Sequence, residues 1–182
     1  MTPLEPALQA ELDLLRASIR DVPDFPKTGI LFKDITPLLQ TPKLFRLSID
    51  HLAEAFQNKG VTHVASVESR GFIFGAPVAY KLNAGYVPIR KKGKLPGKTI
   101  SYTYDLEYGT DTLELHADAL GPGTNVLLID DVLATGGTAF ACTQLLKKLG
   151  AQVAGLSFVI ELDFLHGRDK LHGYQVTSLL RF

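Results

Sequence analysis

The chain has 182 residues, enough for one compact domain with a sizeable buried core. Apolar residues make up 46% and charged residues 21% of the sequence, a balance that excludes a disordered chain or a fibrous repeat. Nineteen Lys and Arg residues offset nineteen Asp and Glu residues, so we expect no nucleic-acid partner. Any anion site must arise from a local cluster of charge.

The single cysteine, Cys142, excludes an intrachain disulfide and any metal centre built from several cysteines. The five histidines show no metal-ligand spacing. The first residues lack a basic segment followed by an apolar run, and no apolar stretch is long enough to cross a bilayer. We therefore expect a cytoplasmic protein that is neither exported nor associated with a membrane.

Helical and strand-like patterns alternate along the first half of the chain. Apolar residues three and four positions apart predict helices, whereas short runs rich in β-branched residues predict strands. Two prolines and a glycine interrupt the pattern after the first helix and predict a loop there. In chain order, we expect an amphipathic helix over 4–19, a structured loop over 21–35, a helix over 45–56, a strand over 61–67, a buried helix over 71–82 and a strand over 86–89.

The second half begins with a basic segment, residues 90–98, which we expect to be mobile. Strands over 99–104 and 112–116 should form a flap-like hairpin around the turn-rich link 107–111. Residues 126–129 are apolar on both faces, as in a central parallel strand. A helix over 137–149, a strand over 153–160, a short helix over 163–171 and a strand over 174–179 should follow. The alternation predicts an α/β fold with a mainly parallel central sheet flanked by helices.

The most specific pattern is the transition from the central strand to the helix after it. Asp130 and Asp131 follow the apolar run, and Thr135-Gly136-Gly137-Thr138 lead into the helix. A parallel strand would deliver both carboxylates to the carboxyl edge of the sheet, where open α/β folds bind ligands. The glycines let backbone N–H groups surround an anion, and the helix N-terminus adds its positive dipole end. The pattern favours a phosphate site over an ordinary strand, turn and helix with capping threonines.

Two carboxylates beside a phosphate would repel it unless they bind something else. Ribose hydroxyls or a divalent cation would satisfy them, so a sugar phosphate fits the whole motif. Two other glycine-containing segments do not qualify as phosphate motifs. Residues 93–99 lack the first glycine of a P-loop, and residues 121–126 precede a strand where a dinucleotide motif would open a helix.

Residues 126–138 resemble the diphosphate-sugar motif of the phosphoribosyltransferases. Four further blocks resemble the adenine phosphoribosyltransferase family in order and spacing: Phe25–Ile35, Glu68–Phe72, Arg90–Gly97 and Leu106–Gly109. The resemblance runs from about Asp24 to the C-terminus. It implies a type I phosphoribosyltransferase-like fold in a single domain, 1–182, with an N-terminal helix and base-binding hood over 1–35, a core over 36–182, and a flexible loop and flap over about 91–117.

The resemblance also implies an activity in purine salvage. Adenine and phosphoribosyl diphosphate, with Mg²⁺ carried by the substrate, would become AMP and diphosphate, and the enzyme would be a homodimer. Two alternatives stay open. One is a phosphoribosyltransferase that acts on another purine, such as hypoxanthine or xanthine. The other is a nucleotide-sensing regulator that keeps the same fold.

Three groups of binding residues are implied by the resemblance. The residues implied to bind the phosphoribosyl group are Asp130, Asp131, Ala134, Thr135, Gly136, Gly137 and Thr138. Those implied to bind diphosphate are Glu68, Ser69, Arg70, Arg90, Lys91 and Lys94. Those implied to bind adenine are Leu31, Phe32, Lys33 and Leu162. The implied catalytic residues are Arg70 and Glu107, and Tyr108 is the neighbour of Glu107 on the flap.

The chemistry of these residues is compatible with such roles. Phe32 and Leu162 can enclose a flat, neutral base, while backbone groups of Leu31 and Lys33 can bind its edge. Lys33 stands where the family can carry arginine, so a bidentate guanidinium contact is lost here. Glu107 can accept the adenine proton. The competing interpretations are a core aromatic for Phe32, a surface turn for Glu107 and solvated charges for the loop lysines.

Overall fold

The structure is a computed structural model that describes residues 6–105 and 109–182. Its internal contacts divide the chain into two compact units, Met1–His51 and Leu52–Phe182. We describe each unit by itself.

The first unit begins with helix α1 (Pro6–Ala17), which lies within the predicted first helix. The loop expected next is wrong in part, because strands β1 (Arg20–Pro23) and β2 (Leu31–Asp34) pair antiparallel there. Pro23 is the last residue of β1, and the other proline lies in the connection between the strands, so no interior position of the ladder lacks an N–H group. The short helix α2 (Thr36–Gln40), which the sequence did not predict, comes next. It is followed by helix α3 (Pro42–Glu54).

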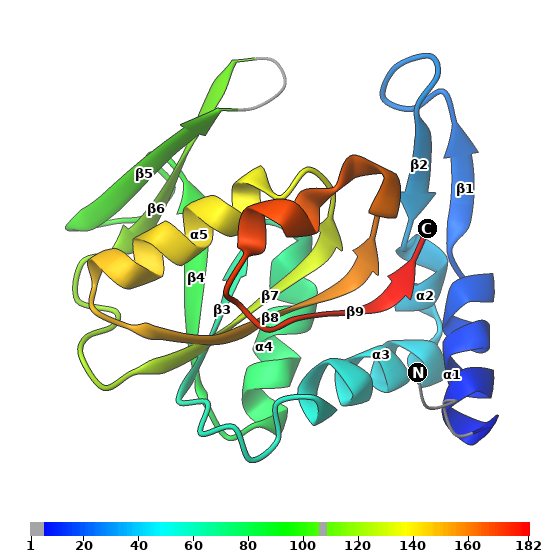
Figure 1. The fold of residues 1–182 in the computed structure, drawn as a ribbon, viewed down its shortest axis with the longest axis horizontal. Coiled ribbons are helices and arrows are strands. Elements are labelled where there is room, and N and C mark those ends of the chain that lie inside the picture. The colour runs from blue at the N-terminus through cyan, green and yellow to red at the C-terminus, as the bar shows by residue number, and fades with distance from the viewer. Residues whose placement is uncertain (1–5, 106–108) are drawn as a thin grey trace. The chain divides into compact units, whose positions relative to one another are not determined.

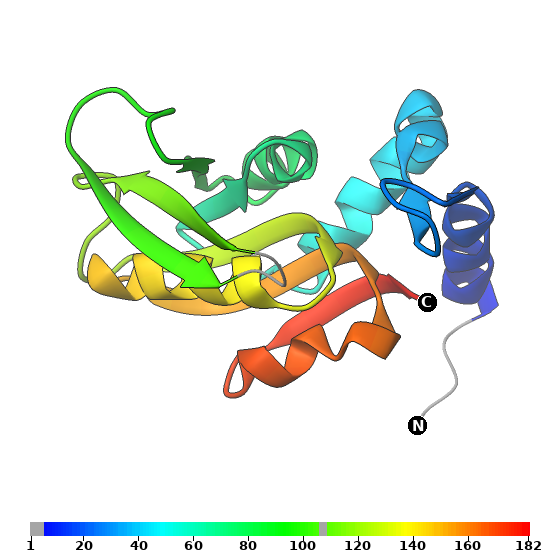
Figure 2. The same cartoon turned by 90° about the horizontal axis from the view of Figure 1, so that it is seen from above.

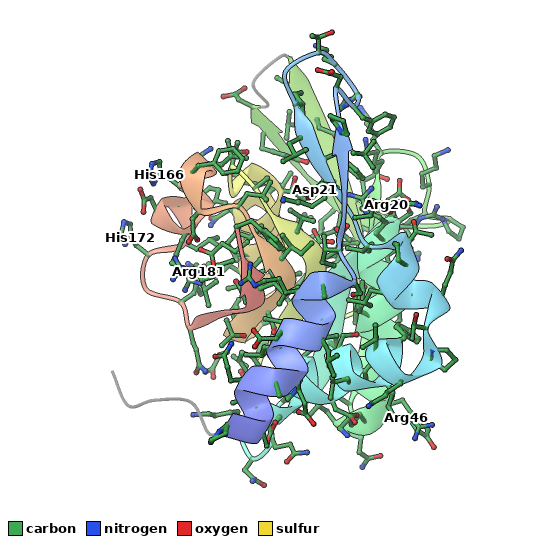
Figure 3. The ribbon with its side chains drawn as sticks, turned by 90° about the vertical axis from the view of Figure 1, so that its right-hand side faces the viewer. Arg20, Asp21, Arg46, His166, His172 and Arg181 are labelled. Atoms are coloured by element: carbon green, nitrogen blue, oxygen red, sulfur yellow. The ribbon has the colours of Figure 1, made fainter. Side chains whose placement is uncertain are left out.

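Two ion pairs cross the β1–β2 hairpin. The Arg20 guanidinium lies 2.5 Å from an Asp34 carboxylate oxygen, and Lys33 Nζ lies 2.6 Å from Asp21 Oδ1. Figure 3 labels Arg20 and Asp21 on this hairpin. The hydrogen bonds that Asp34 accepts, first from Thr36 and then from Arg20, lower its pKa to about 2. These charge-assisted contacts join the two strands of this short polar hairpin.

In the described part of the second unit, seven strands form one sheet in the order β5-β6-β4-β3-β7-β8-β9 (Figure 1). The strands β4, β3, β7, β8 and β9 are parallel, whereas β5 and β6 form an antiparallel hairpin that continues from β4. Their bounds are β3 His63–Val67, β4 Gly85–Lys91, β5 Thr99–Asp105, β6 Thr110–His116, β7 Asn125–Leu133, β8 Gln152–Glu161 and β9 Val176–Arg181. The predicted mainly parallel α/β sheet and its hairpin are confirmed.

Helices α4 (Arg70–Lys81) and α5 (Gly137–Lys148) cover opposite faces of this sheet (Figure 2). Residues 126–129 of β7 are fully buried, as expected for a strand with helices on both sides. On the α4 face, a Cβ on Gly75 would strike the Ser66 hydroxyl, so the glycine lets α4 lie close to β3. The predicted short helix near the C-terminus is two 3₁₀ helices, η1 (Asp163–Leu165) and η2 (Gly167–Leu171).

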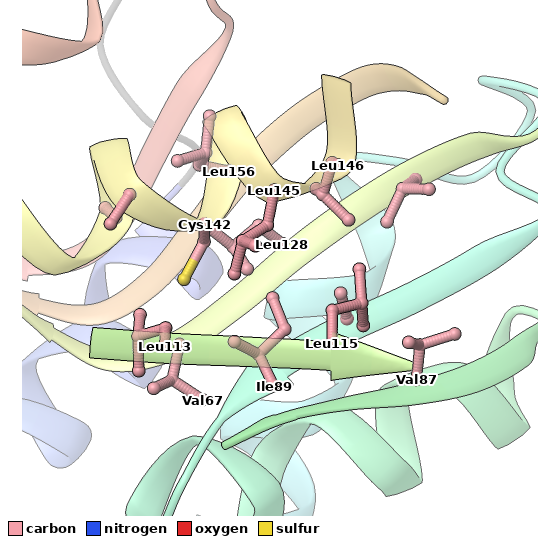
Figure 4. Close-up of a cluster of buried hydrophobic side chains, with 14 of the residues drawn as sticks. Val67, Val87, Ile89, Leu113, Leu115, Leu128, Cys142, Leu145, Leu146 and Leu156 are labelled. Atoms are coloured by element: carbon pink, nitrogen blue, oxygen red, sulfur yellow. The ribbon is translucent and has the colours of Figure 1, made fainter. Parts of the chain in front are cut away.

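The α5 face carries a cluster of buried apolar side chains (Figure 4). Leu145 and Leu146 of α5 are fully buried against inward-facing residues of the strands, among them Leu128 and Leu156. Cys142 lies in the same cluster with no exposed surface, and burial is the main reason that its pKa lies well above that of an ordinary thiol. The cysteine is therefore part of the hydrophobic core, as its sequence context indicated. Across the described residues we find no helix with the length and apolar character that crossing a membrane requires.

Candidate active site

The candidate site lies along one edge of the sheet of the second unit. Since β3, β4, β7 and β8 are parallel, their carboxyl ends meet at this edge. β3 ends just before Glu68-Ser69-Arg70, β4 ends at Arg90-Lys91, β7 contains Asp130-Asp131, and β8 ends just before Leu162. The fold thus brings to one edge segments that are far apart in the sequence.

The turn between β7 and α5 has the geometry expected of an anion-binding loop. Gly136 caps the N-terminus of α5 with a φ of 78°, a left-handed conformation that favours glycine. A Cβ on Gly136 would also strike the carbonyl oxygen of Gly167. Both constraints favour glycine at this position, at the end of the helix where the first backbone N–H groups have no partner within the helix.

Asp131 is nearly buried and is paired with an arginine from another strand end. The side chain of Asp131 is 7% exposed, and its Oδ2 accepts a hydrogen bond from Nε of Arg70, which is 50% exposed. The pair links the first turn of α4 to β7. The pair fixes the guanidinium of Arg70 at the edge of the sheet where β3 and β7 end.

Asp130 has a different environment from Asp131. Its Oδ1 accepts the backbone N–H of Asp131 at 3.0 Å. A Cβ on Gly71 would lie 2.7 Å from the same oxygen, so the α4 backbone closes over this carboxylate. Removal from water raises the pKa of Asp130 well above that of an ordinary aspartate, and the charge of Asp131 raises it further.

Hydrogen bonds connect some of the predicted diphosphate-binding residues at the ends of β3 and β4. Arg90 Nε donates to Glu68 Oε2 at 2.6 Å, and an Nη of Arg90 donates to the Lys94 carbonyl oxygen at 3.2 Å. Ser69 caps α4 without a side-chain hydrogen bond to the helix. Lys91 instead extends to β6, where its Nζ lies 3.2 Å from Asp111 Oδ2. The structure therefore pairs Glu68 with Arg90, pairs Arg70 with Asp131, and pairs Lys91 with Asp111 of the hairpin.

The β5–β6 hairpin lies against the anion-binding loop. The Tyr104 hydroxyl lies 3.1 Å from Thr138 Oγ1. A Cβ on Gly137 would lie 3.5 Å from the Tyr104 ring and 3.6 Å from the Asp105 carbonyl oxygen. The expected flap residues Glu107 and Tyr108 lie outside the described residues.

The residues predicted to bind adenine belong partly to the first unit and partly to the second. In the first unit, Leu31, Phe32 and Lys33 are consecutive residues of β2, and the Phe32 ring contacts Phe25 edge to face at 5.2 Å. The Lys33 side chain is 12% exposed and paired with Asp21. In the second unit, the Leu162 N–H donates to the Leu133 carbonyl oxygen at 2.9 Å, so Leu162 directly follows the paired part of β8 and β7.

Sequence reasoning missed two features that support the site from behind. One is Gly167, because a Cβ there would strike the Ala134 carbonyl oxygen and lie 2.8 Å from Gly136 N. The other is Glu161, which is 4% exposed, accepts two hydrogen bonds from Arg168 at 2.8 and 2.5 Å and a third from Ser178. A glycine with ordinary backbone angles and a strand glutamate give no local signal of such contacts.

The donor set does not form a metal cage of its own. Among residues 6–105 and 109–182, no three His, Cys, Asp or Glu side chains are grouped as metal ligands would be. The one adjacent carboxylate pair at the site consists of Asp130, whose charged form is disfavoured, and Asp131, which is bonded to Arg70. These side chains fit a cation that arrives with most of its ligands already supplied.

Comparisons with known proteins agree with this geometry. The phosphoribosyl transferase domain family matches residues 34–177. The adenine phosphoribosyltransferase of Maridesulfovibrio salexigens is 58% identical and covers 92% of this chain and 98% of its own. The corresponding enzyme of Methylococcus capsulatus is 57% identical and covers 94% of this chain and 100% of its own.

Solved structures give the same result. The adenine phosphoribosyltransferase of Thermoanaerobacter pseudethanolicus superposes with a TM-score of 0.91 at 52% identity, covering 94% of this chain and 99% of that one. The Saccharomyces cerevisiae enzyme, solved with an imino-altritol bisphosphate and adenine, gives 0.89 at 43% identity with the same coverage. The chain therefore belongs to the phosphoribosyltransferase family, in its adenine phosphoribosyltransferase branch.

Proposed function

We propose that the sheet edge described above binds phosphoribosyl diphosphate and transfers its phosphoribosyl group to adenine, giving AMP and diphosphate. The observation that carries the proposal is the meeting of the Asp130-Asp131 pair, Arg70 and the left-handed turn at Gly136 at one edge. The relatives support the choice of substrate. The Saccharomyces cerevisiae structure contains adenine, and the Trypanosoma brucei enzyme, 26% identical with a TM-score of 0.85, was solved with AMP, pyrophosphate and ribose 5-phosphate.

The β7–α5 turn would hold the 5-phosphate. Its N–H groups and the hydroxyls of Thr135 and Thr138 donate to phosphate oxygens, along with the backbone of Ala134, Gly136 and Gly137. Asp131 and Asp130 would accept hydrogen bonds from the ribose hydroxyls, which satisfies two carboxylates that a phosphate alone would repel. This division explains why acids and a phosphate loop are adjacent in one motif.

The leaving diphosphate would be met by Arg70. As the bond from the anomeric carbon to the diphosphate oxygen breaks, negative charge grows on the leaving group and positive charge grows on the sugar. Asp131 holds the Arg70 guanidinium in place before substrate arrives. Arg90, Lys94 and Lys91, together with backbone groups of Glu68 and Ser69, would complete the diphosphate site.

The base would be bound by Leu31, Phe32, Lys33 and Leu162, with residues 1–35 acting as the hood and 36–182 as the core. A ring nitrogen of adenine attacks the anomeric carbon as diphosphate leaves, and the adenine proton passes to Glu107. Residues 91–117, which include Glu107 and Tyr108, would serve as a flexible loop and flap. Excluding water at this stage prevents hydrolysis of the activated sugar.

Magnesium would enter on the oxygens of phosphoribosyl diphosphate. Bound there, the cation neutralises part of the diphosphate charge. Asp130 and Asp131 are the side chains that would contact it, directly or through water.

A homodimer in the cytoplasm is the assembly and location that we propose. The outward face of α4 supports the dimer, because Ile73 and Tyr80 are 38% and 90% exposed and stand seven positions apart on one helical face. Ala76 is exposed between them. An apolar stripe of this kind is suited to a second copy of the chain.

The test is to incubate purified protein with Mg²⁺, phosphoribosyl diphosphate and labelled adenine, and to measure AMP. We expect AMP to form, and the double variant Asp130→Asn/Asp131→Asn to lose most of this activity. Faster turnover of hypoxanthine or guanine than of adenine would favour the other purine activity. Binding of nucleotide without turnover of any purine would favour the regulator.

A further inference from the structure

The Tyr104 hydroxyl, which is paired with Thr138 Oγ1 of the anion-binding loop, has no role in the function proposed so far. Tyr104 belongs to β5 and Thr138 to the first turn of α5, and their oxygens are 3.1 Å apart. Gly137, the neighbour of Thr138, allows the Tyr104 ring and the Asp105 backbone to approach within ordinary contact distance. The hairpin thus touches the loop at the residue whose hydroxyl is expected to bind phosphate.

The other end of β5 is also attached to α5. Lys148, in the last turn of the helix, donates to the Ser101 carbonyl oxygen at 2.9 Å, and its Nζ lies 5.2 Å from the centre of the Tyr102 ring. These contacts fix the direction of β5 along the helix. Tyr104 is therefore held over the N-terminal turn of α5 by packing at both ends of the strand.

The direction of the hydrogen bond decides what the pair can do. Burial raises the pKa of Tyr104 above that of free tyrosine, so the phenol keeps its proton at neutral pH. A phenol proton given to Thr138 Oγ1 leaves the threonine proton available to a third group. In this arrangement the proton of the Thr138 hydroxyl is not used by Tyr104 and can be donated to a ligand.

We propose that Tyr104 is a positioning residue for the 5-phosphate: it donates to Thr138 and thereby orients the Thr138 hydroxyl to donate to a phosphate oxygen. The inference rests on the proposed function of the β7–α5 turn. Aligned hydroxyls polarise one another, so the second hydrogen bond is stronger when the first is present. The hairpin would then contribute to binding of the sugar phosphate through a residue that does not touch it.

The test compares the wild type with Tyr104→Phe, which removes only the hydroxyl, and with Tyr102→Phe as the matched control on the same strand. Calorimetry with ribose 5-phosphate and, separately, with diphosphate gives the two affinities. We expect Tyr104→Phe to weaken ribose 5-phosphate about two- to tenfold, the size expected for one neutral hydrogen bond, and to leave diphosphate unchanged. Correspondingly, KM for phosphoribosyl diphosphate should rise while KM for adenine stays constant.

A double-mutant cycle separates orientation from general packing. Because Thr138→Val removes the hydroxyl that Tyr104 orients, adding Tyr104→Phe to it should have little further effect on ribose 5-phosphate. Three outcomes would each overturn the inference. They are independent effects of the two substitutions on ribose 5-phosphate affinity, an equal loss of diphosphate affinity in Tyr104→Phe, and an equal loss of ribose 5-phosphate affinity in Tyr102→Phe. If the wild type itself does not bind ribose 5-phosphate, the proposed function fails and the inference falls with it.

Discussion

The neighbouring aspartates of β7, Asp130 and Asp131, have different surroundings. Asp131 is bonded to the Arg70 guanidinium, whereas Asp130 faces a backbone N–H and the closely packed Gly71. A carboxylate that is removed from water beside a second negative charge destabilises the folded protein in its ionised form. Under the proposed function, the charge of Asp130 would serve the ligand at a cost to the stability of the fold.

The first prediction concerns Asp130→Asn. A hydrogen bond to a charged group contributes about 1.5–3 kcal/mol, so loss of the charge should lower kcat/KM for phosphoribosyl diphosphate about 10- to 150-fold. The melting temperature should rise, since a charge that the site disfavours is gone. The pKa of Asp130 is raised in the folded state, so wild-type stability should decline as pH increases from the ordinary aspartate range through that raised pKa.

Denaturant unfolding across this pH range is the measurement. The Asp130→Asn variant should lack the decline that the wild type shows. A melting temperature below that of the wild type at neutral pH would contradict the assignment of an unfavourable charge to Asp130.

At the scale of elements, the anion-binding turn depends on packing that reaches it from η2. Gly167 lies behind the turn with its backbone against Ala134 and Gly136. Arg168, the next residue, is anchored on Glu161 of β8 and donates to the Val176 carbonyl oxygen of β9 at 2.8 Å. The 3₁₀ helix η2 thus links the turn to β8 and β9. Leu162 lies between β8 and η1.

The second prediction is that Gly167→Ala weakens binding of ribose 5-phosphate. Its new methyl group would strike backbone atoms, which cannot rotate away as a side chain can, so the turn must shift. Gly121→Ala is the control, because a Cβ there meets nothing within 4 Å and its φ is not positive. We expect Gly167→Ala to bind ribose 5-phosphate at least tenfold more weakly, a change of about 1.4 kcal/mol in binding free energy, and Gly121→Ala to bind it as the wild type does. Equal affinities in calorimetry would contradict the supporting role of Gly167.

The third prediction concerns Arg168→Met. Hydrogen bonds from Arg168, the largest cause, hold the pKa of Glu161 below its usual value of 4.5. The pair therefore stabilises the fold above that pH, and its contribution disappears as pH falls through the lowered pKa of the folded state. We expect the free energy of unfolding of Arg168→Met to be about 1–2 kcal/mol lower than that of the wild type at neutral pH. The effect is smaller than for a fully buried ion pair, because Arg168 is 40% exposed.

Urea unfolding at pH 7 and in acid tests this dependence. The difference between wild type and Arg168→Met should shrink in acid. Arg181→Met is the matched control, because Arg181 lies 3.8 Å from Glu161 and is 58% exposed, so its loss should be smaller. A difference that does not change with pH would show that Arg168 acts by packing alone.

The same elements show what the sequence could and could not predict. The β7 strand, its turn and α5 were predicted because an apolar run, adjacent acids and glycines coincide within a few positions. The β1–β2 hairpin was missed, because prolines that signal a break in a helix also fit the end of an edge strand. The contact of Gly167 with Gly136 joins two distant segments, and a single sequence has no local pattern that reports such a contact.

On the scale of the whole molecule, parallel strands explain why the site residues could be grouped from one sequence. Each strand ends at the same edge, so residues that follow β3, β4, β7 and β8 must be neighbours once the topology is known. With α4 and α5 on the two faces of the sheet, the site residues lie at its carboxyl edge, and the outer surface of α4 carries the exposed Ile73 and Tyr80. The predicted group of adenine-binding residues depends in addition on the first unit, and its assignment stays a prediction.

The fourth prediction tests association through α4. Ile73→Glu and Tyr80→Glu each place a charge on the exposed apolar stripe, which a dimer interface would have to bury without a partner. We expect sedimentation velocity to show a dimer for the wild type and a monomer for both variants. The control Gln57→Glu adds the same charge at an exposed position outside α4 and should stay dimeric. Variants that sediment as the wild type does would place the interface elsewhere.

The position of Cys142 makes this protein suitable for thiol-labelling experiments without engineering. The chain has one sulfhydryl, and it lies on the buried face of α5 with no accessible surface. An alkylating reagent can reach it only after α5 separates from the sheet, so the rate of modification reports how often that separation occurs. Since α5 begins at the anion-binding turn, occupancy of the turn should be readable as protection of a single sulfur atom.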